Sequence, residues 1–332
     1  MRFVLFVLIS ALAPLLEGAE PVIMRIHHTA PLDHQITLAL HAFALDVEER
    51  SSGRIDVDVV TKPRPMIPAP NFAKAVASGE LEAACMPNFL WTGTIPQMGF
   101  SMIPYLFTEK QQMEAFPVSR AADYLEDKLA AQGVKTLAWL HVTRATVFTS
   151  ERPILEPGDF KGLRIRTMSD FARYPFEKVG GKPQRLSAGL VPAAIERGEL
   201  DAVMTDVSSS IGLELYELHE SATLAPYFSA FYHLYVDPAW LDNLAPELRR
   251  GVVEAGETLT KTAVTITEAR AAASADILRA EGVALHVQSP EEADAWKQVM
   301  QGVAIEAFEK DVPEGKEFLD LLPGVNAKDG TR

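Results

Sequence analysis

The same local pattern, a helix followed by a glycine turn and a strand, occurs twice in this chain. Residues 72–86 contain Gly-Glu-Leu-Glu-Ala at positions 79–83, and residues 190–204 contain Gly-Glu-Leu-Asp-Ala at positions 198–202. Each copy places a short apolar strand directly after the turn. The chain has 332 residues, which is long enough for two domains. The repeat therefore indicates two α/β domains of similar build.

Further predicted helices and strands fit the α/β class. Residues 22–28 and 54–60 alternate like strands, and Asp33 between them can cap a helix that reaches about Arg50. Residues 134–142, 163–165, 231–236 and 283–287 also have strand character. The buried candidates on the first helix are Leu38, Phe43, Leu45 and Val47.

One predicted helix is unusually long. Residues 246–281 contain no proline after position 246 and have helical spacing, and a helix of this length usually crosses more than one body. A last helix begins at Ser289, because Ser289, Pro290 and Glu292 provide a cap, a first-turn proline and a capping-box glutamate.

The N-terminal segment predicts export. Arg2 precedes an almost purely apolar run from Phe3 to Leu16, which is too short to span a bilayer but typical of a signal-peptide core. We expect cleavage near Ala19. The single cysteine, Cys85, excludes an internal disulfide, and because no cysteine lies near the cleavage site we expect no lipid anchor. The mature protein should be exported and free in solution.

The charge of the chain limits its partners. The net charge is −14, which argues against nucleic acid or an anionic membrane as a partner. If the ligand is an anion, its site must be a local positive pocket on an acidic protein.

The usual signatures of catalysis and cofactor binding are missing from the sequence. His27 and His28 are adjacent on a strand and point to opposite faces, and the sequence has no HExxH or cysteine–histidine metal pattern. It also has no Gly-x-Ser-x-Gly motif and no glycine-rich nucleotide loop after a strand. We therefore expect no metal, no cofactor and no catalytic residue.

Two arginines are better candidates for a functional site. Arg144 and Arg166 each lie just past an apolar strand, where open α/β sheets place their ligands. A guanidinium group binds a carboxylate through two parallel hydrogen bonds. Arg164 lies on the same face of the strand as Arg166, so the pattern alone does not choose between these two, and a surface ion pair remains the alternative role.

At this point the chain resembles the periplasmic substrate-binding subunits of TRAP (tripartite ATP-independent periplasmic) transporters of the DctP type. The resemblance covers nearly all of the mature chain. Its strongest segment is Phe-Lys-Gly-Leu-Arg-Ile-Arg at positions 160–166, followed at the expected distance by the unit at positions 198–201. Residues 78–82, 103–107 and 240–248 resemble further segments of the family.

The resemblance implies a two-lobed periplasmic binding protein fold, with crossing strands and a long interdomain helix. It implies a first lobe of residues 20–143 and about 230–265, and a second lobe of residues 144–229 and about 266–326. Residues 1–19 would be the signal peptide and 327–332 a frayed tail.

The resemblance also implies the site residues. Arg166 corresponds to the family arginine that binds the substrate carboxylate, and Arg144 to a second family arginine. Pro87 and Asn88 correspond to the residues that end the first repeated strand, and Thr205 stands where the family usually has asparagine. We expect His28, Trp91 and Asp206 to line the rest of the pocket, whereas Ala188 stands where some relatives have a stacking aromatic residue.

The expected function is that of a periplasmic receptor that binds a small organic acid and delivers it to TRAP membrane permease subunits, without changing it chemically. A monomer is expected, with a dimer as the alternative. Two other functions remain open: a periplasmic α/β hydrolase acting on an anionic substrate, and a ligand-sensing module.

Overall fold

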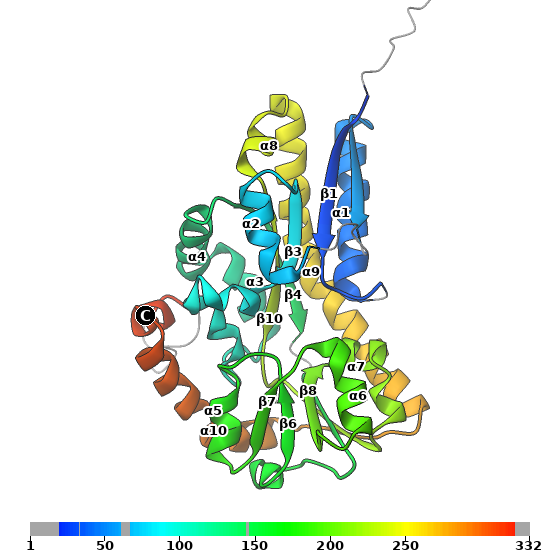
Figure 1. Ribbon diagram of the computed structural model, residues 1–332, viewed down its shortest axis with the longest axis vertical. Coiled ribbons are helices and arrows are strands. Elements are labelled where there is room, and N and C mark those ends of the chain that lie inside the picture. The colour runs from blue at the N-terminus through cyan, green and yellow to red at the C-terminus, as the bar shows by residue number, and fades with distance from the viewer. Residues whose placement is uncertain (1–19, 33, 61–66, 144–145, 323–332) are drawn as a thin grey trace, which may run out of the picture.

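The computed structural model describes residues 20–32, 34–60, 67–143 and 146–322. The predicted signal peptide, the capping residue Asp33, Arg144 and the predicted tail lie outside the described residues. Figure 1 shows two lobes, one at each end of the molecule's long axis.

Lobe I is built on a five-stranded sheet, in which β1 pairs with parallel neighbours and β10 with antiparallel ones. The repeated pattern of the sequence begins here, with helix α2 (Phe72–Ala77), a turn at Gly79 with a φ of 73°, and strand β3. The strand order is β2 (Ile55–Val60), β1 (Val22–His28), β3 (Ala83–Pro87), β10 (Ala230–Val236) and β4 (Lys135–Thr143).

Lobe II is built on a six-stranded mixed sheet. Its copy of the pattern is helix α6 (Val191–Glu196), a turn at Gly198 with a φ of 65°, and strand β8. The strand order is β11 (Ala284–Val287), β9 (Ser221–Ala225), β5 (Thr146–Ser150), β8 (Ala202–Asp206), β6 (Arg164–Thr167) and β7 (Lys182–Arg185). The predicted two-lobed α/β fold is therefore confirmed.

The chain crosses between the lobes more than once. Strand β4 lies in lobe I and β5 in lobe II, while β9 lies in lobe II and β10 returns to the middle of the lobe I sheet. The long helix α9 (Pro246–Ala280) contacts α1 and β4 in lobe I and α7 and β11 in lobe II. Figure 1 shows this helix running from the top of the molecule down into lobe II. The predicted long helix thus packs against both lobes, as expected.

Helix α9 packs very closely on β4. A Cβ atom added at Gly256 would lie 2.3 Å from the carbonyl oxygen of Leu137. A glycine at this position lets the helix backbone approach the edge strand of the lobe I sheet. The Thr260 hydroxyl on the same helix accepts a hydrogen bond from the backbone N–H of Trp139.

The remaining helices cover the two sheets. They are α1 (Gln35–Ser51), α3 (Lys110–Ala115), α4 (Arg120–Ala130), α5 (Arg173–Lys178), α7 (Val207–Gly212), α8 (Pro238–Asp242), α10 (Pro290–Asp311) and α11 (Gly315–Leu319). The predicted capping box is present: the Ser289 hydroxyl accepts from the N–H of Glu292, whose carboxylate accepts from the N–H of Ser289. Helix α11 contacts α4, so the C-terminal part returns to lobe I, which the expected division of the chain did not foresee.

Of the four residues that the sequence analysis expected to be buried on α1, two are buried and two are exposed. Phe43 and Val47 are buried, but Leu38 and Leu45 are 52% and 67% exposed. Leu38 and Leu45 are seven residues apart, so they share one helix face, which the structure leaves in solvent. The face that packs on the sheet carries Ile36, Leu40, Phe43 and Val47 instead.

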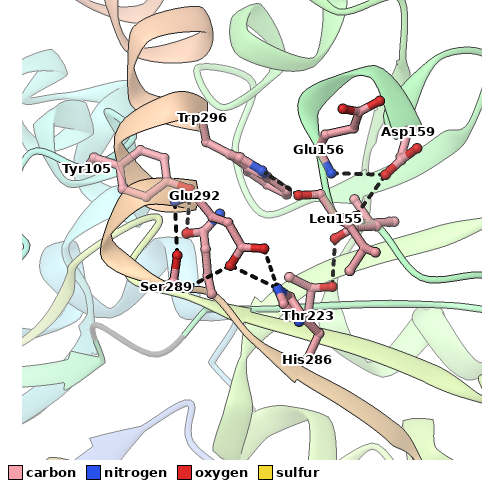
Figure 2. A network of polar contacts seen from close by, with 11 residues as sticks. Tyr105, Leu155, Glu156, Asp159, Thr223, His286, Ser289, Glu292 and Trp296 are labelled. Atoms are coloured by element: carbon pink, nitrogen blue, oxygen red, sulfur yellow. Dashed lines mark hydrogen bonds and ion pairs between the residues drawn. The ribbon is translucent and has the colours of Figure 1, made fainter.

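A network of polar contacts joins the lobes beside α10 (Figure 2). The Glu292 carboxylate contacts His286 at 3.0 Å, and the indole N–H of Trp296 donates to the carbonyl of Leu155. From lobe I, the Tyr105 hydroxyl donates to the side chain of Gln288 at 3.0 Å.

The backbone of Tyr105 also takes part in the junction between the lobes. Tyr105 adopts a positive φ of 54°, which tyrosine rarely does, and its backbone N–H donates to the carbonyl of Tyr227 at 2.7 Å. These contacts fix one side of the junction between the lobes.

Among the described residues, the structure has no helix with the length and apolar character that a membrane span requires.

Candidate functional site

A cavity of about 430 Å³ is lined by residues of both lobes. Thr29, Pro87 and Tyr232 line it from lobe I, and Arg166 and Thr205 line it from lobe II. Thr29 follows β1, and Arg166 and Thr205 lie near the carboxyl ends of β6 and β8. Open α/β sheets bind their ligands beyond the carboxyl ends of the strands, so the position is that of a ligand site.

The main charged group of the cavity is Arg166, which is only 4% exposed. Its Nε donates to the carbonyl oxygen of Leu186 and its Nη1 to that of Met204, each at 2.9 Å. Strand β6 lies between β7 and β8, so the carbonyl groups at the ends of both neighbouring strands hold the guanidinium in place. The described residues provide no hydrogen-bond partner for Nη2, which is left for a ligand.

The positive charge of Arg166 is costly in this position. Burial lowers the pKa of Arg166 to about 10, and the nearby charge of Asp206 acts in the opposite direction. The guanidinium therefore stays protonated at neutral pH. Among the described residues no carboxylate forms a salt bridge with it, and a buried charge without a partner is unfavourable. A ligand carboxylate would provide that partner.

Asp206 is the second charged group of the cavity and is 7% exposed. It ends β8 and caps α7, because its Oδ1 accepts from the backbone N–H of Ser209 at 2.9 Å. The same oxygen lies 3.6 Å from Nε2 of His34, which caps α1 in lobe I. Burial acts to raise the pKa of Asp206, but the contacts with His34 and Ser209 outweigh it and the pKa is lowered.

The walls of the cavity are largely apolar. Phe89, Leu90 and Phe228 line it together with Met168 and Val142. The sequence analysis did not identify these residues as parts of a site, because they come from four separate segments whose local patterns carry no sign of a shared surface. Ala188, noted in the sequence as a replacement for an aromatic residue, also lines the cavity.

The structure brings three of the seven expected site residues together. Arg166, Thr205 and Asp206 line the cavity, whereas Arg144 lies outside the described residues. Pro87, which the resemblance paired with Asn88, also lines it. His28, Asn88 and Trp91 are not among the residues that line the cavity.

Asn88 and Trp91 instead belong to the interior of lobe I. Asn88 is fully buried, and its side-chain amide donates to the carbonyl of Met98 at 2.7 Å and accepts from the backbone N–H of Phe231 at 3.2 Å. The ring of Trp91 packs edge-on against Tyr235, with centroids 5.2 Å apart. Both side chains therefore serve packing and backbone hydrogen bonding.

His28 ends β1, directly before Thr29, which lines the cavity, and it has other histidines nearby. It is 5% exposed, and burial, together with the nearby His41, His34 and His27, lowers its pKa to about 4. The imidazole is therefore neutral at pH 7, so it adds no positive charge for an anionic ligand.

The two arginines of β6 differ clearly in the structure. Arg164 is about one-third exposed and forms a two-point contact with Asp201, with its Nε 2.9 Å from Oδ2. It lines a larger cavity of about 790 Å³ in lobe II, beside Asp201 and His219. Because Arg164 already has a carboxylate partner and Arg166 does not, the cavity between the lobes is the better candidate for an anionic ligand.

No group of three or more histidine, cysteine, aspartate or glutamate residues that could hold a metal ion occurs in the described part of the chain. Cys85 is fully buried, and burial raises the pKa of its thiol. A buried thiol that stays protonated behaves as a small core residue.

Comparison with protein families gives one clear match. Residues 26–311 match the model of the DctP family, described as bacterial extracellular solute-binding protein, family 7. Among curated proteins, the chain is 23% identical over 303 residues to the C4-dicarboxylate-binding periplasmic protein DctP of Rhodobacter capsulatus, covering 88% of each chain. It is 25% identical over 225 residues to a solute-binding protein of Albidiferax ferrireducens, covering 67% of this chain and 66% of that protein.

Solved structures share the fold. A TRAP periplasmic solute-binding protein of Chromohalobacter salexigens with bound D-glucuronate superposes with a TM-score of 0.82 at 21% identity, covering 91% of this chain and 99% of that one. An extracytoplasmic solute receptor of Bordetella pertussis that binds pyroglutamic acid gives a TM-score of 0.80 at 18% identity, with coverage of 91% and 99%.

Proposed function

The chain belongs to family 7 of the bacterial extracellular solute-binding proteins, the DctP family, and on this basis we propose that it is the periplasmic receptor of a TRAP transporter and binds an organic acid through Arg166. The observation that carries the proposal is the buried guanidinium of Arg166. It lines the cavity between the lobes and has two carbonyl partners but no carboxylate partner among the described residues.

The relatives support a carboxylate as the recognised group. One curated relative is named for C4-dicarboxylates, and the two structural relatives bind D-glucuronate and pyroglutamic acid. All of these ligands carry a carboxylate. A fixed guanidinium recognises this group by charge and by geometry, which gives both affinity and orientation.

The proposed mechanism is ligand-dependent closure. The ligand contacts both lobes in the cavity, so it binds the closed arrangement more strongly than the open one and shifts the population toward closure. Closure removes water from the cavity, and the charge interaction with Arg166 becomes stronger in the lower local dielectric. The closed receptor would then deliver the acid to a TRAP membrane permease.

The location and assembly follow from the same proposal. Proteins of this family work outside the cytoplasm, and we place this chain in the periplasm of a Gram-negative cell as a monomer. The family is one of binding proteins without enzymatic activity, so a hydrolase is not favoured.

The test is isothermal titration calorimetry with a panel of organic acids, after a thermal-shift screen has found the acids that bind. Arg166→Ala should weaken binding by about 2–5 kcal/mol, which is roughly 30-fold or more, because it removes the only free cation of the cavity among the described residues. Arg166→Lys keeps the charge but loses the planar fork, and should weaken binding less.

Arg164→Ala is the matched control. It lies on the same strand, has its own partner in Asp201 and should leave the affinity unchanged. Equal affinity of the Arg166→Ala variant and the wild-type chain for every acid that binds would refute the proposed role. Circular dichroism spectra of all variants would show whether the fold is retained.

A further inference from the structure

The cavity holds a negative charge as well as a positive one. Asp206 is buried, lines the cavity and forms no salt bridge with Arg166. The two side chains come from the neighbouring strands β8 and β6, and Arg166 is anchored to the carbonyl groups of Leu186 and Met204 rather than to Asp206. A ligand in the cavity therefore meets two separate charged groups of opposite sign.

The carboxylate of Asp206 is only partly satisfied by the protein. Its Oδ1 receives the N–H of Ser209 at 2.9 Å, and His34 approaches the same oxygen at 3.6 Å, which is longer than an ordinary hydrogen bond. The structure gives Oδ2 no hydrogen-bond partner among the described residues. Asp206 thus keeps one acceptor oxygen for a group that can donate a hydrogen bond.

The charge of this carboxylate is maintained at neutral pH. The contacts with His34 and Ser209 outweigh the effect of burial, so the pKa of Asp206 is lowered and the group stays ionised. A second carboxylate of a ligand placed near it would meet a like charge in a site with little water, which is strongly unfavourable.

A second arginine lines the cavity but does not offset this effect. Arg185 is more than half exposed and already pairs with Asp170 at 2.8 Å. Its charge is both neutralised by that partner and screened by solvent, so it offers little to a second ligand carboxylate. Among the described residues, the buried charges of the cavity are one guanidinium and one carboxylate.

We propose that Asp206 makes the cavity selective for the charge of its ligand. The preferred ligand is a monocarboxylate that also carries a hydrogen-bond donor, such as an ammonium or amide N–H group, and a dicarboxylate is disfavoured. This inference rests on the proposed function, because the ligand carboxylate is taken to bind Arg166. The donor of the ligand binds Asp206, and the apolar walls formed by Phe89, Met168 and Phe228 enclose the carbon skeleton.

The experiment compares acids that differ only in the group distant from the first carboxylate. Glutarate is compared with 5-aminopentanoate and pentanoate, and succinate with 4-aminobutanoate and butanoate, by calorimetry on the full wild-type chain. The other acids that bind in the thermal-shift screen are sorted into the same three classes, which are dicarboxylates, monocarboxylates with a donor and monocarboxylates without one, and the affinities of the three classes are compared. We expect the strongest ligands to be monocarboxylates with a donor, at least tenfold tighter than the matched dicarboxylates.

The variant Asp206→Asn keeps the size of the side chain and the oxygen that caps α7, but removes the charge. It should raise the affinity for dicarboxylates about tenfold or more relative to the donor-bearing monocarboxylates. Arg166→Ala should weaken both classes equally. If Asp206→Asn does not fold, the ranking on the wild-type chain still decides the question.

Three results would overturn the inference. A dicarboxylate as the strongest ligand of the wild-type chain would do so and leave the proposed function intact. Equal binding of acids with and without a donor would also contradict it while preserving the role of Arg166. If no acid of any class binds the wild-type chain, the proposed function itself fails, and the inference fails with it.

Discussion

Oδ1 of Asp206 lies 3.6 Å from Nε2 of His34, so the cap of helix α7 in lobe II contacts the cap of helix α1 in lobe I. Each of these residues satisfies a backbone N–H at the start of its own helix and also faces the other lobe. The contact is almost fully buried, with His34 3% and Asp206 7% exposed. It is therefore a direct link between the two lobes at the edge of the cavity.

Removing this link should favour the open arrangement of the lobes. Asparagine caps helices well, so His34→Asn should retain the start of α1, but its side chain is too short to reach Asp206. The expected result is a larger radius of gyration in small-angle X-ray scattering without ligand, and an affinity lowered by up to about tenfold, or 1.4 kcal/mol. His41→Asn changes an exposed histidine on the same helix and should have neither effect. An unchanged radius and affinity for His34→Asn would show that the contact does not stabilise closure.

Acid should destabilise the protein already below about pH 6.5. Burial lowers the pKa of His28 and His219 to about 4 and that of His233 to about 3, from an ordinary value of 6.5. Below pH 6.5 the unfolded chain takes up protons that the folded chain does not, so stability is lost as the pH falls toward 4. Each histidine contributes about 1.4 kcal/mol per pH unit in this window.

Urea unfolding at several pH values between 7.5 and 5 measures this slope. His219→Gln can retain a hydrogen bond with Thr149 and should reduce the slope by the share of one histidine. A stability that stays constant over this pH range would contradict the prediction.

Gly256→Ala should destabilise the protein by about 1–3 kcal/mol or more. The added methyl group would lie 2.3 Å from the carbonyl oxygen of Leu137, so helix α9 would have to move away from β4. Gly302→Ala in α10 is the control, because its Cβ would meet no atom within 4 Å and alanine is the better helix former by about 1 kcal/mol. Urea unfolding should therefore show changes of opposite sign, and stabilisation by Gly256→Ala would exclude the close packing of α9 on β4.

Asn88→Ala should lower stability rather than affinity. The change leaves the carbonyl of Met98 and the N–H of Phe231 without the side chain that they contact in the interior, which costs about 2–4 kcal/mol. Thermal unfolding and calorimetry on the same sample separate the two effects. A large loss of affinity with an unchanged melting temperature would instead support the contact with ligand that the family resemblance implies for Asn88.

Much of the architecture follows from local patterns. Strand β1 and helix α9 were predicted within a residue or two of their observed ends, since alternation and uninterrupted helical spacing are properties of short segments. The cap at Ser289 was predicted correctly for the same reason. Strand β5 was missed, because its five residues are all buried and show no alternation and, unlike the equally buried β3 and β8, it follows no repeated helix–turn unit.

The site was less accessible to sequence reasoning. The spacing of Arg164 and Arg166 gave no reason to choose between them, and the difference lies in their surroundings. Arg164 reaches Asp201, whereas Arg166 lies at the strand end that faces the cavity. The contributions of Tyr232 and Phe228 depend on the return of the chain to lobe I after β9. No local pattern contains that information.

The position of strand β10 has a consequence for the synthesis of the protein. Residues 230–236 lie between β3 and β4 in the lobe I sheet, although the strands of lobe II from β5 to β9 precede them in the chain. While the ribosome has not yet produced these residues, β3 and β4 have no common partner, and the sheet of lobe I is open in its middle. A chain released early would expose two unpaired strand edges, which promote aggregation. Lobe I, although it contains the N-terminal strand, therefore cannot complete its sheet until most of lobe II has been synthesised.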